Sequence, residues 1–318
     1  MKKIAYLQLH RICDQECVFC AQPSNGSVLD FKAIKKQIDA FVQDGYSKVI
    51  FSGGEPSLNK DFFEVIAYGK SLGIEMTILS NGHRFSEYDF AKKSVESGLL
   101  QYHISLHSHI SDIHDALVKK PGSLKRCFQA LHHLLSLSAH ITINITINAY
   151  NVSYFDRLIK AILKEFPSIH GFIINNLETS QIPREHYSVI AKLSEIKKTI
   201  PNTLQILENS GKKFRIERVP FCYIRGYEHH STDLEYVIDG EEKFLHYLGE
   251  SRASHKVKKE NYVHNSKYGE SCSACDLKGL CAGQEGLNIH YFPEELIPQT
   301  VSEAEKKQII QKFYECYC

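Results

Sequence analysis

The chain has 318 residues, 43% of them hydrophobic and 24% charged, with a formal net charge of +1. This length can bury a large core, and one large domain with a smaller one is the expected organisation. The balanced charge gives no electrostatic argument for a nucleic-acid partner, and the lack of a long apolar run or a signal-peptide pattern argues against a membrane and for a cytoplasmic location.

Short apolar or β-branched runs alternate with amphipathic segments along the chain as far as residue 175. We predict strands over residues 4–9, 48–51, 75–79, 102–106, 140–148 and 171–175. A helix begins after an N-cap at Asp30, and further helices are predicted over residues 61–72, 86–97, 123–136 and 154–165. Six strand–helix cycles with short connections predict an α/β fold, a parallel sheet with helices outside it that forms a partial (β/α)6 barrel.

The repeating pattern is expected to end after one more helical segment, over residues 185–200, because Pro201 should break it. The remainder is irregular in pattern and rich in Lys, His and Tyr. We therefore predict a barrel domain over residues 1–205 and a small C-terminal domain over residues 206–318.

Three cysteines, Cys13, Cys17 and Cys20, follow the first predicted strand at C-x3-C-x2-C spacing. Thiolates are the ligands that iron–sulfur clusters require, and three of them leave one iron of a four-iron cluster open for a reaction. A zinc site is the main alternative, but structural zinc normally takes a fourth protein ligand. A disulfide framework fits poorly in a chain without a secretory signal.

Polar residues follow the ends of the other predicted strands. Because the carboxyl ends of parallel strands meet at one edge of a sheet, these residues are expected to converge with the cysteine loop and form a ligand site. They are Ser52, Gly53, Gly54 and Glu55 after the second strand, Ser80 and Asn81 after the third, Ser105 in the fourth and Asn144 in the fifth.

The cysteine triplet, with Phe19 before its last cysteine, and the Gly-Gly-Glu-Pro sequence that ends at Pro56 together resemble the radical S-adenosylmethionine (SAM) enzymes. The resemblance implies that the methionyl group of SAM binds the open iron. One electron then cleaves SAM to a 5′-deoxyadenosyl radical, which abstracts hydrogen from the substrate. An external one-electron donor of the flavodoxin or ferredoxin type is implied as a partner.

The resemblance also implies roles for the strand-end residues. Gly53 and Gly54 would let the backbone approach the methionyl ammonium, and Glu55 would either accept a hydrogen bond from it or brace the loop. The remaining polar groups suit the carboxylate, ribose and adenine of SAM, although each of them could instead satisfy local backbone groups. Similar enzymes often pair the carboxylate with an arginine, for which Lys119 and Lys120 are the candidates here.

A second cysteine group, Cys272, Cys275 and Cys281, has C-x2-C-x5-C spacing. It resembles the auxiliary-cluster extension of radical SAM enzymes that modify ribosomally made peptides, except that Glu285 stands where the extension continues with a cysteine. The resemblance implies one auxiliary four-iron cluster, two clusters in all. Its fourth ligand would come from the tail, Cys316 or Cys318, or else be Cys222; a zinc knuckle is the alternative.

If the tail supplies that ligand, Cys222 is left over as a free thiol that can give a hydrogen atom to a carbon radical. This arrangement resembles the epipeptide-type peptide epimerases, which implies conversion of L-valine or L-isoleucine to the D-form in a ribosomally synthesised precursor peptide. Cys222 would donate hydrogen after abstraction from Cα. Two alternatives stay open: a peptide cross-linking enzyme (thioether or carbon–carbon) in which Cys222 is a ligand, and a non-catalytic iron–sulfur electron carrier.

Overall fold

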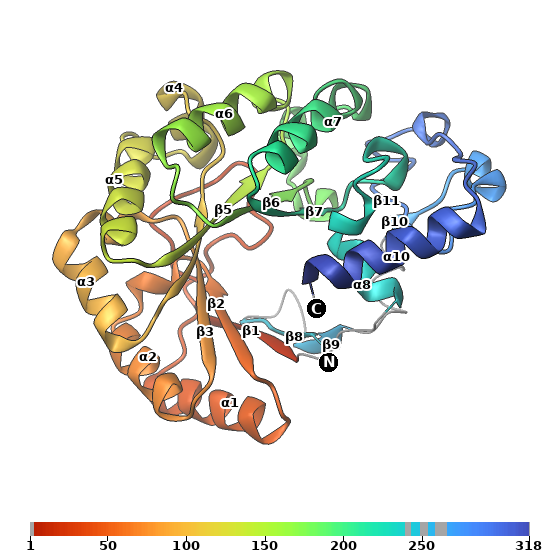
Figure 1. The fold of residues 1–318 in the computed structure, drawn as a ribbon. Coiled ribbons are helices and arrows are strands. Elements are labelled where there is room, and N and C mark those ends of the chain that lie inside the picture. Colours follow the sequence, from red (N-terminus) through yellow and green to blue (C-terminus); the bar gives the residue numbers. More distant parts are fainter. Residues whose placement is uncertain (1–2, 239–242, 249–253, 258–265, 318) are drawn as a thin grey trace. The chain divides into compact units, whose positions relative to one another are not determined.

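The computed structural model describes residues 3–238, 243–248, 254–257 and 266–317 (Figure 1). The chain forms two compact units, one made of residues 1–144, 163–171 and 241–257 and the other of residues 145–162, 172–240 and 258–318. This division differs from the predicted boundary near residue 205, because later segments return to the first unit and add to its sheet.

The first unit is built on a parallel sheet. The strands β1 (Ile4–His10), β2 (Lys48–Gly53), β3 (Glu75–Ser80), β4 (Gln101–Ser105) and β5 (His140–Thr146) each pair with the next one in parallel. β8 (Lys243–His246) pairs in parallel with the other edge of β1, and β9 (His255–Val257) pairs antiparallel with β8. The sequence pattern did not predict these last two strands.

Helices cover the outer face of this sheet (Figure 1). They are α1 (Phe31–Gln43), α2 (Phe62–Ser71), α3 (Tyr88–Ser97), α4 (Ser111–Val118) and α5 (Ser123–Ser136). The Asp30 side chain accepts from the backbone N–H of Ala33 at 2.7 Å, which confirms the predicted N-cap of α1. Cys127 on α5 is completely buried, as expected for a core residue.

The second unit contains the end of the repeating pattern and the C-terminal segments. Its regular elements are β6 (Gly171–Asn175), α7 (Leu193–Asn209), β7 (Lys213–Glu217), α8 (Thr232–Ile238) and α10 (Glu303–Tyr317), with a small antiparallel pair of β10 (Ser266–Lys267) and β11 (Gln284–Glu285). The connecting helix α6 covers Phe155–Glu165. The six strands β1 to β6 and their helices confirm the predicted α/β partial barrel.

The prediction that Pro201 ends the helical pattern is wrong, because α7 continues through Pro201 to Asn209. The apolar face of α7 stays buried beyond the proline, at Leu204 and Leu207, and this packing outweighs the hydrogen bond that proline cannot make. Among the described residues, no helix is both long and apolar enough to cross a membrane.

Candidate functional site

The cysteine loop follows β1 and is held against the end of α4. The backbone N–H of Glu16 donates to the carbonyl of Val118 at 3.1 Å, and that of Val18 donates to Leu117 at 3.0 Å. The ring of Phe19 packs edge-on against His107, with 4.8 Å between centroids. The loop therefore takes its shape partly from a helix that sequence periodicity did not predict.

The three thiols of this loop, from Cys13, Cys17 and Cys20, are partly buried. Burial raises the pKa of each, that of Cys13 to about 12, and neighbouring thiols raise the pKa of Cys17 further. In the described part of the chain these sulfur atoms do not all lie within 4.8 Å of one another, whereas tetrahedral zinc would hold them about 3.8 Å apart. Three thiols from one loop have the chemistry that a four-iron cluster with one open iron needs.

The glycines after β2 make room for the cysteine loop. Gly53 has φ +125°, and an added Cβ there would stand 2.1 Å from the carbonyl oxygen of His10. At Gly54 it would stand 2.0 Å from the carbonyl oxygen of Ile12. The backbone N–H groups of Gly54 and Glu55 donate to these two carbonyls at 2.9 and 2.8 Å. The close approach that requires glycine is therefore made by the cysteine loop, and contact with the SAM ammonium stays a prediction.

Glu55 is buried and braces two strand ends. Its Oε1 accepts from the backbone N–H and hydroxyl of Ser57, at 3.1 and 2.6 Å, and from Ser80 Oγ at 2.8 Å. Its Oε2 accepts from the backbone N–H of Asn81 at 2.7 Å. Burial raises the pKa of Glu55 and these donors oppose the rise. Ser80 Oγ also accepts from Gly82 N at 2.9 Å, so Glu55 and Ser80 serve the loop structure.

A polar network that the sequence analysis missed links the cysteine loop to β3 and α5. Asp14 accepts from Asn81 Nδ2 and pairs with His83 Nδ1, both at 2.7 Å. His83 Nε2 lies 2.7 Å from Ser123 Oγ, which also accepts from Gln15 Nε2 at 2.8 Å. Asp14 and Gln15 lie between the first two cysteines of the motif, and this position in the sequence is the feature that could have pointed to the network. Asn81 therefore positions the loop.

Three predicted SAM contacts lie on half-exposed positions of the sheet: Ser52 on β2, Ser105 on β4 and Asn144 on β5. Ser105 and Asn144 are direct partners across the β4–β5 pair, so their side chains project from the same face. Alternate residues of both strands are buried on the opposite face, against the helices. These three positions suit contacts with SAM, which stay predicted.

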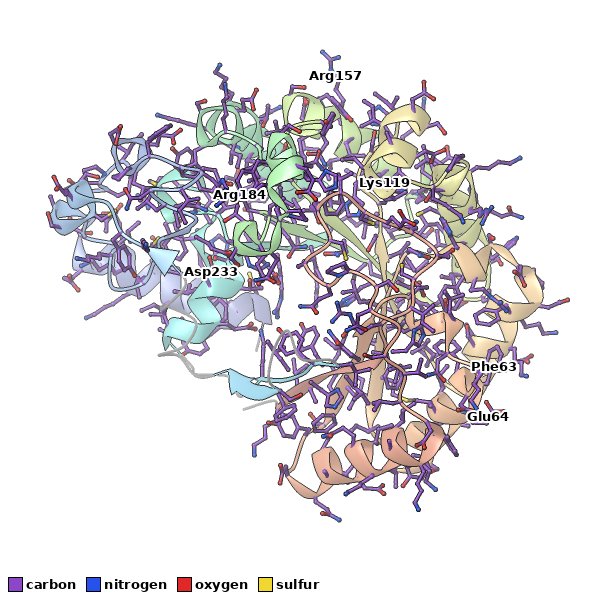
Figure 2. The ribbon with its side chains drawn as sticks, turned by 180° about the vertical axis from the view of Figure 1, so that it is seen from behind. Phe63, Glu64, Lys119, Arg157, Arg184 and Asp233 are labelled. Atoms are coloured by element: carbon purple, nitrogen blue, oxygen red, sulfur yellow. The ribbon has the colours of Figure 1, made fainter. Side chains whose placement is uncertain are left out.

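The positively charged residue buried beside the cysteine loop is neither Lys119 nor Lys120, the two candidates from the sequence. Lys119 is exposed at the end of α4 with φ 50° (Figure 2), and the Lys120 backbone closes the same turn. Arg11 is buried beside the loop instead. Its guanidinium donates to the carbonyls of Pro23 and Leu248, and its charge opposes the burial-raised pKa of Cys20. Arg11 therefore favours the thiolate form that a cluster needs.

In the second unit, four cysteines line one small, mostly apolar pocket: Cys222, Cys272, Cys275 and Cys281. Burial raises the pKa of Cys222, and Cys272 and Cys275 raise it further, as expected for neighbouring thiols. The backbone N–H of Gln299 donates to Cys275 Sγ at 3.3 Å and that of Gly283 donates to Cys281 Sγ at 3.4 Å. Such bonds to sulfur are typical around iron–sulfur clusters.

The candidates for the fourth ligand of this group lie in different surroundings. Cys316 is exposed on α10 and is not among the residues that line the pocket, while Cys318 lies outside the described residues. Cys222 reaches the pocket on a short turn, Phe221–Tyr223, which Tyr223 Oη anchors by donating to the carbonyl of Glu295 at 2.7 Å. Cys222 therefore lies with Cys272, Cys275 and Cys281, and its role as fourth ligand or as hydrogen donor stays a prediction.

Glu285 stands where the auxiliary extension would continue with a cysteine. Its carboxylate accepts from the backbone N–H of Ser180 at 3.1 Å and pairs with Arg218 at 3.9 Å. Burial raises the pKa of Glu285, and both partners oppose the rise. Glu285 therefore connects segments of the second unit, and the pocket-lining residues do not include it.

Comparisons with known proteins agree with this geometry. Residues 7–162 match the model of the radical SAM superfamily. The AdoMet-dependent heme synthase of Oleidesulfovibrio alaskensis is 27% identical over 48% of this chain and 40% of its own length. The GTP 3′,8-cyclase of Vibrio vulnificus is 36% identical over 34% of this chain and 35% of its own length. The chain thus spans less than half the length of these curated relatives.

Two solved structures share the fold over nearly the whole chain. Streptococcus suis SuiB bound to SAM is 14% identical, with a TM-score of 0.67 over 95% of this chain and 77% of its own; SuiB is also known with its precursor peptide SuiA bound. The anSMEcpe complex with AdoMet and the Cp18Cys peptide is 14% identical, with a TM-score of 0.66 over 98% of this chain and 96% of its own. The chain therefore carries a radical SAM domain, and it has the α/β fold of that superfamily.

Proposed function

We propose that this protein is a radical SAM enzyme that cross-links a ribosomally synthesised peptide by oxidation, through a thioether or a carbon–carbon bond. The observation that carries the proposal is the group of four thiols, Cys222, Cys272, Cys275 and Cys281, around one pocket. Four protein ligands complete a four-iron cluster, so the cluster stores electrons without offering an iron to the substrate. Forming a cross-link removes two hydrogen atoms from the peptide. The 5′-deoxyadenosyl radical would take one, and the other would leave as a proton to solvent and an electron that such a cluster can accept.

A peptide substrate is supported by the fold. SuiB and anSMEcpe, which resemble this chain over most of its length, have both been solved with peptides bound. The curated relatives with other substrates match less than half of their own length. We therefore propose a precursor peptide as the partner, with an external electron donor of the flavodoxin or ferredoxin type.

The chain's own residues hold and shield the reacting groups. When bound to Cys13, Cys17 and Cys20, the four-iron cluster with SAM supplies a radical that takes a hydrogen atom from the peptide. The paired glycines and the Glu55 brace keep the cysteine loop close to β2 and β3. Half-exposed polar groups on β2, β4 and β5 are proposed to orient SAM.

Peptide epimerisation with Cys222 as hydrogen donor is the second candidate. One observation favours it: burial raises the pKa of Cys222, so the thiol keeps its hydrogen at neutral pH. The auxiliary cluster would then have three cysteine ligands, and valine or isoleucine would be the target, as the resemblance implies.

One experiment separates the two candidates. The reconstituted protein is incubated with SAM, reductant and a candidate precursor peptide in deuterium oxide, and the peptide mass is measured. Cross-linking lowers the mass by two units, whereas epimerisation raises it by one unit for each converted residue. A gain of mass without cross-links would refute the first proposal.

The variant Cys222→Ala gives a second, independent readout. If Cys222 is a ligand, the variant changes the electron paramagnetic resonance (EPR) spectrum of the auxiliary cluster and still cleaves SAM. If Cys222 is the donor, that spectrum is unchanged and only deuterium incorporation stops. Cys127→Ala, a change at a buried cysteine outside both groups, controls for the loss of a thiol elsewhere.

A further inference from the structure

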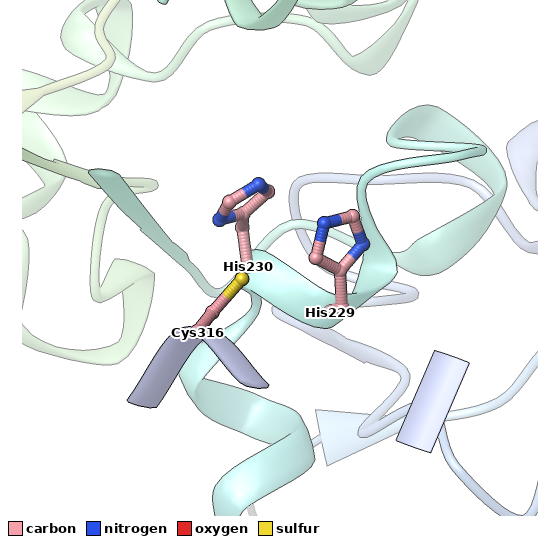
Figure 3. A group of neighbouring side chains, drawn as sticks. All are labelled: His229, His230 and Cys316. Atoms are coloured by element: carbon pink, nitrogen blue, oxygen red, sulfur yellow. The ribbon is translucent and has the colours of Figure 1, made fainter. Parts of the chain in front are cut away.

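A third group of metal-ligating side chains lies in the second unit, outside the auxiliary pocket. His229 and His230 end a short turn, Glu228–His230, and Cys316 lies in the last turn of α10 (Figure 3). One ligand atom from each residue can be chosen so that all three lie within 4.8 Å of one another. His229 is buried and Cys316 is exposed, so an ion could enter from the solvent side.

Packing holds the two imidazoles next to α10. The ring of His230 stacks on Phe214 with 3.8 Å between centroids, and the rings of His229 and His230 are 4.1 Å apart. Arg225 pairs with Glu228 on the same turn and lies 3.9 Å from Glu305 on α10. The turn and the helix are therefore joined near this group by contacts that do not involve the three ligands.

The donor set has the chemistry of a zinc site. Imidazole nitrogen and thiolate sulfur bind Zn²⁺ at about 2.0–2.3 Å, so tetrahedral geometry places such donors about 3.3–3.6 Å apart. The three atoms lie within 4.8 Å of one another, and side-chain rotations would close the rest of the gap to that spacing. A set of three protein ligands leaves the fourth position to water.

The charges around the group are compatible with a metal. Burial lowers the pKa of His229 to about 4 and that of His230 to about 3, so both imidazoles are neutral at pH 7. Burial raises the pKa of the Cys316 thiol and Glu315 and Glu208 add to the rise, while the ammonium groups of Lys312 and Lys213 oppose it. Both lysines thereby favour the thiolate that a metal needs, and the thiolate in turn offsets their repulsion of a cation.

We propose that His229, His230 and Cys316 bind one Zn²⁺ ion, and that the ion fastens the end of α10 to the turn that carries the histidines. Residues far apart in the sequence become linked, and closing such a long loop stabilises the fold by restricting the unfolded chain. This role would also explain why Cys316 lies away from the auxiliary thiols. The proposal is independent of the reaction assigned to the radical SAM domain.

The test uses the full chain with its iron–sulfur clusters reconstituted under anaerobic conditions. After incubation with Zn²⁺ and removal of excess metal, zinc and iron are counted by mass spectrometry, and X-ray absorption at the zinc edge identifies the ligands. We expect one zinc per chain, with a first shell of two nitrogen ligands and one sulfur ligand from protein. Zinc should also slow hydrogen exchange in the last turns of α10.

Cys316→Ser and His230→Gln should each weaken zinc binding by more than about 100-fold, with iron content and circular dichroism unchanged. His132→Ala, a change at an exposed histidine that pairs with Glu165 and packs against Phe166, is the matched control and should bind zinc as the wild type does. Wild-type protein that retains no zinc, or a Cys316→Ser variant that binds zinc as tightly as the wild type, would overturn the proposal.

Discussion

Replacing Gly54 by alanine should disrupt the radical-cluster site by a steric contact alone. The backbone at Gly54 does not adopt a positive φ, but the added Cβ would stand 2.0 Å from the Ile12 carbonyl oxygen, where ordinary contacts begin at 3.4 Å. The cysteine loop and the end of β2 must therefore separate by more than an ångström. Overpacking of this kind costs about 1–3 kcal/mol, and losing the hydrogen bond from Glu55 N to Ile12 O adds about 1 kcal/mol.

The free energy of unfolding of the cluster-free protein should therefore fall by about 2–4 kcal/mol, as measured by urea denaturation. Because Ile12 immediately precedes Cys13, reconstituted Gly54→Ala should also bind less iron at the radical site and cleave SAM slowly. Gly45→Ala is the control: its φ is +79° with no atom within 4 Å, so it costs only about 1 kcal/mol and leaves iron binding unchanged. Full iron content and normal SAM cleavage in Gly54→Ala would refute the steric argument.

Three further predictions concern other parts of the molecule. Glu55→Gln puts an N–H donor where Glu55 now only accepts, which should lower the free energy of unfolding by about 1–3 kcal/mol. The control Glu75→Gln, at an exposed ion pair with Lys48, should lower it by less than about 1 kcal/mol. Equal losses would contradict the role of Glu55 in bracing the strand ends. Burial lowers the pKa of His107 from its ordinary value of 6.5 to about 3. Between these two pH values the unfolded chain binds a proton at His107 and the folded chain does not. As pH falls from 6.5 to 4, the free energy of unfolding of the wild type should therefore fall faster than that of His107→Gln, by about 1.4 kcal/mol per pH unit. Urea titrations at several pH values measure this, and equal slopes against pH for the two proteins would count against a buried neutral imidazole. Cys222→Ala should release auxiliary-cluster iron to a chelator at least about tenfold faster than the wild type, while Cys316→Ala should not, and the reverse result would restore Cys316 as the ligand.

Local patterns in the sequence predicted most of the regular structure. The helix over residues 123–136 and the strand over residues 171–175 have the predicted bounds, since their apolar spacing and their flanking residues agree. Helix α4, a short element of eight residues, was not predicted. β8 is a short segment whose partner, β1, is remote in sequence, so its pairing depends on tertiary contacts.

For the radical site, the sequence by itself determined which three cysteines are the candidate ligands and where the glycine pair stands, because loop spacing and residue type are local properties. Only the tertiary structure shows how the strand-end polar groups are placed, and their contacts with SAM stay predicted. Glu55, Ser80 and Asn81 make hydrogen bonds to neighbouring loops, whereas Ser105 and Asn144 lie half-exposed across a strand pair.

The cysteines of the second unit also show which features the sequence predicts and which depend on the tertiary structure. The spacing of Cys272, Cys275 and Cys281 predicts a cluster motif, and for its fourth ligand the sequence favoured a tail cysteine, Cys316 or Cys318, with Cys222 as the alternative. Cys222 lies 50 positions before Cys272 and Cys316 lies 35 positions after Cys281, and separation along a chain does not determine distance in space. Only folding decides that Cys222 joins the auxiliary pocket while Cys316 lies beside two histidines.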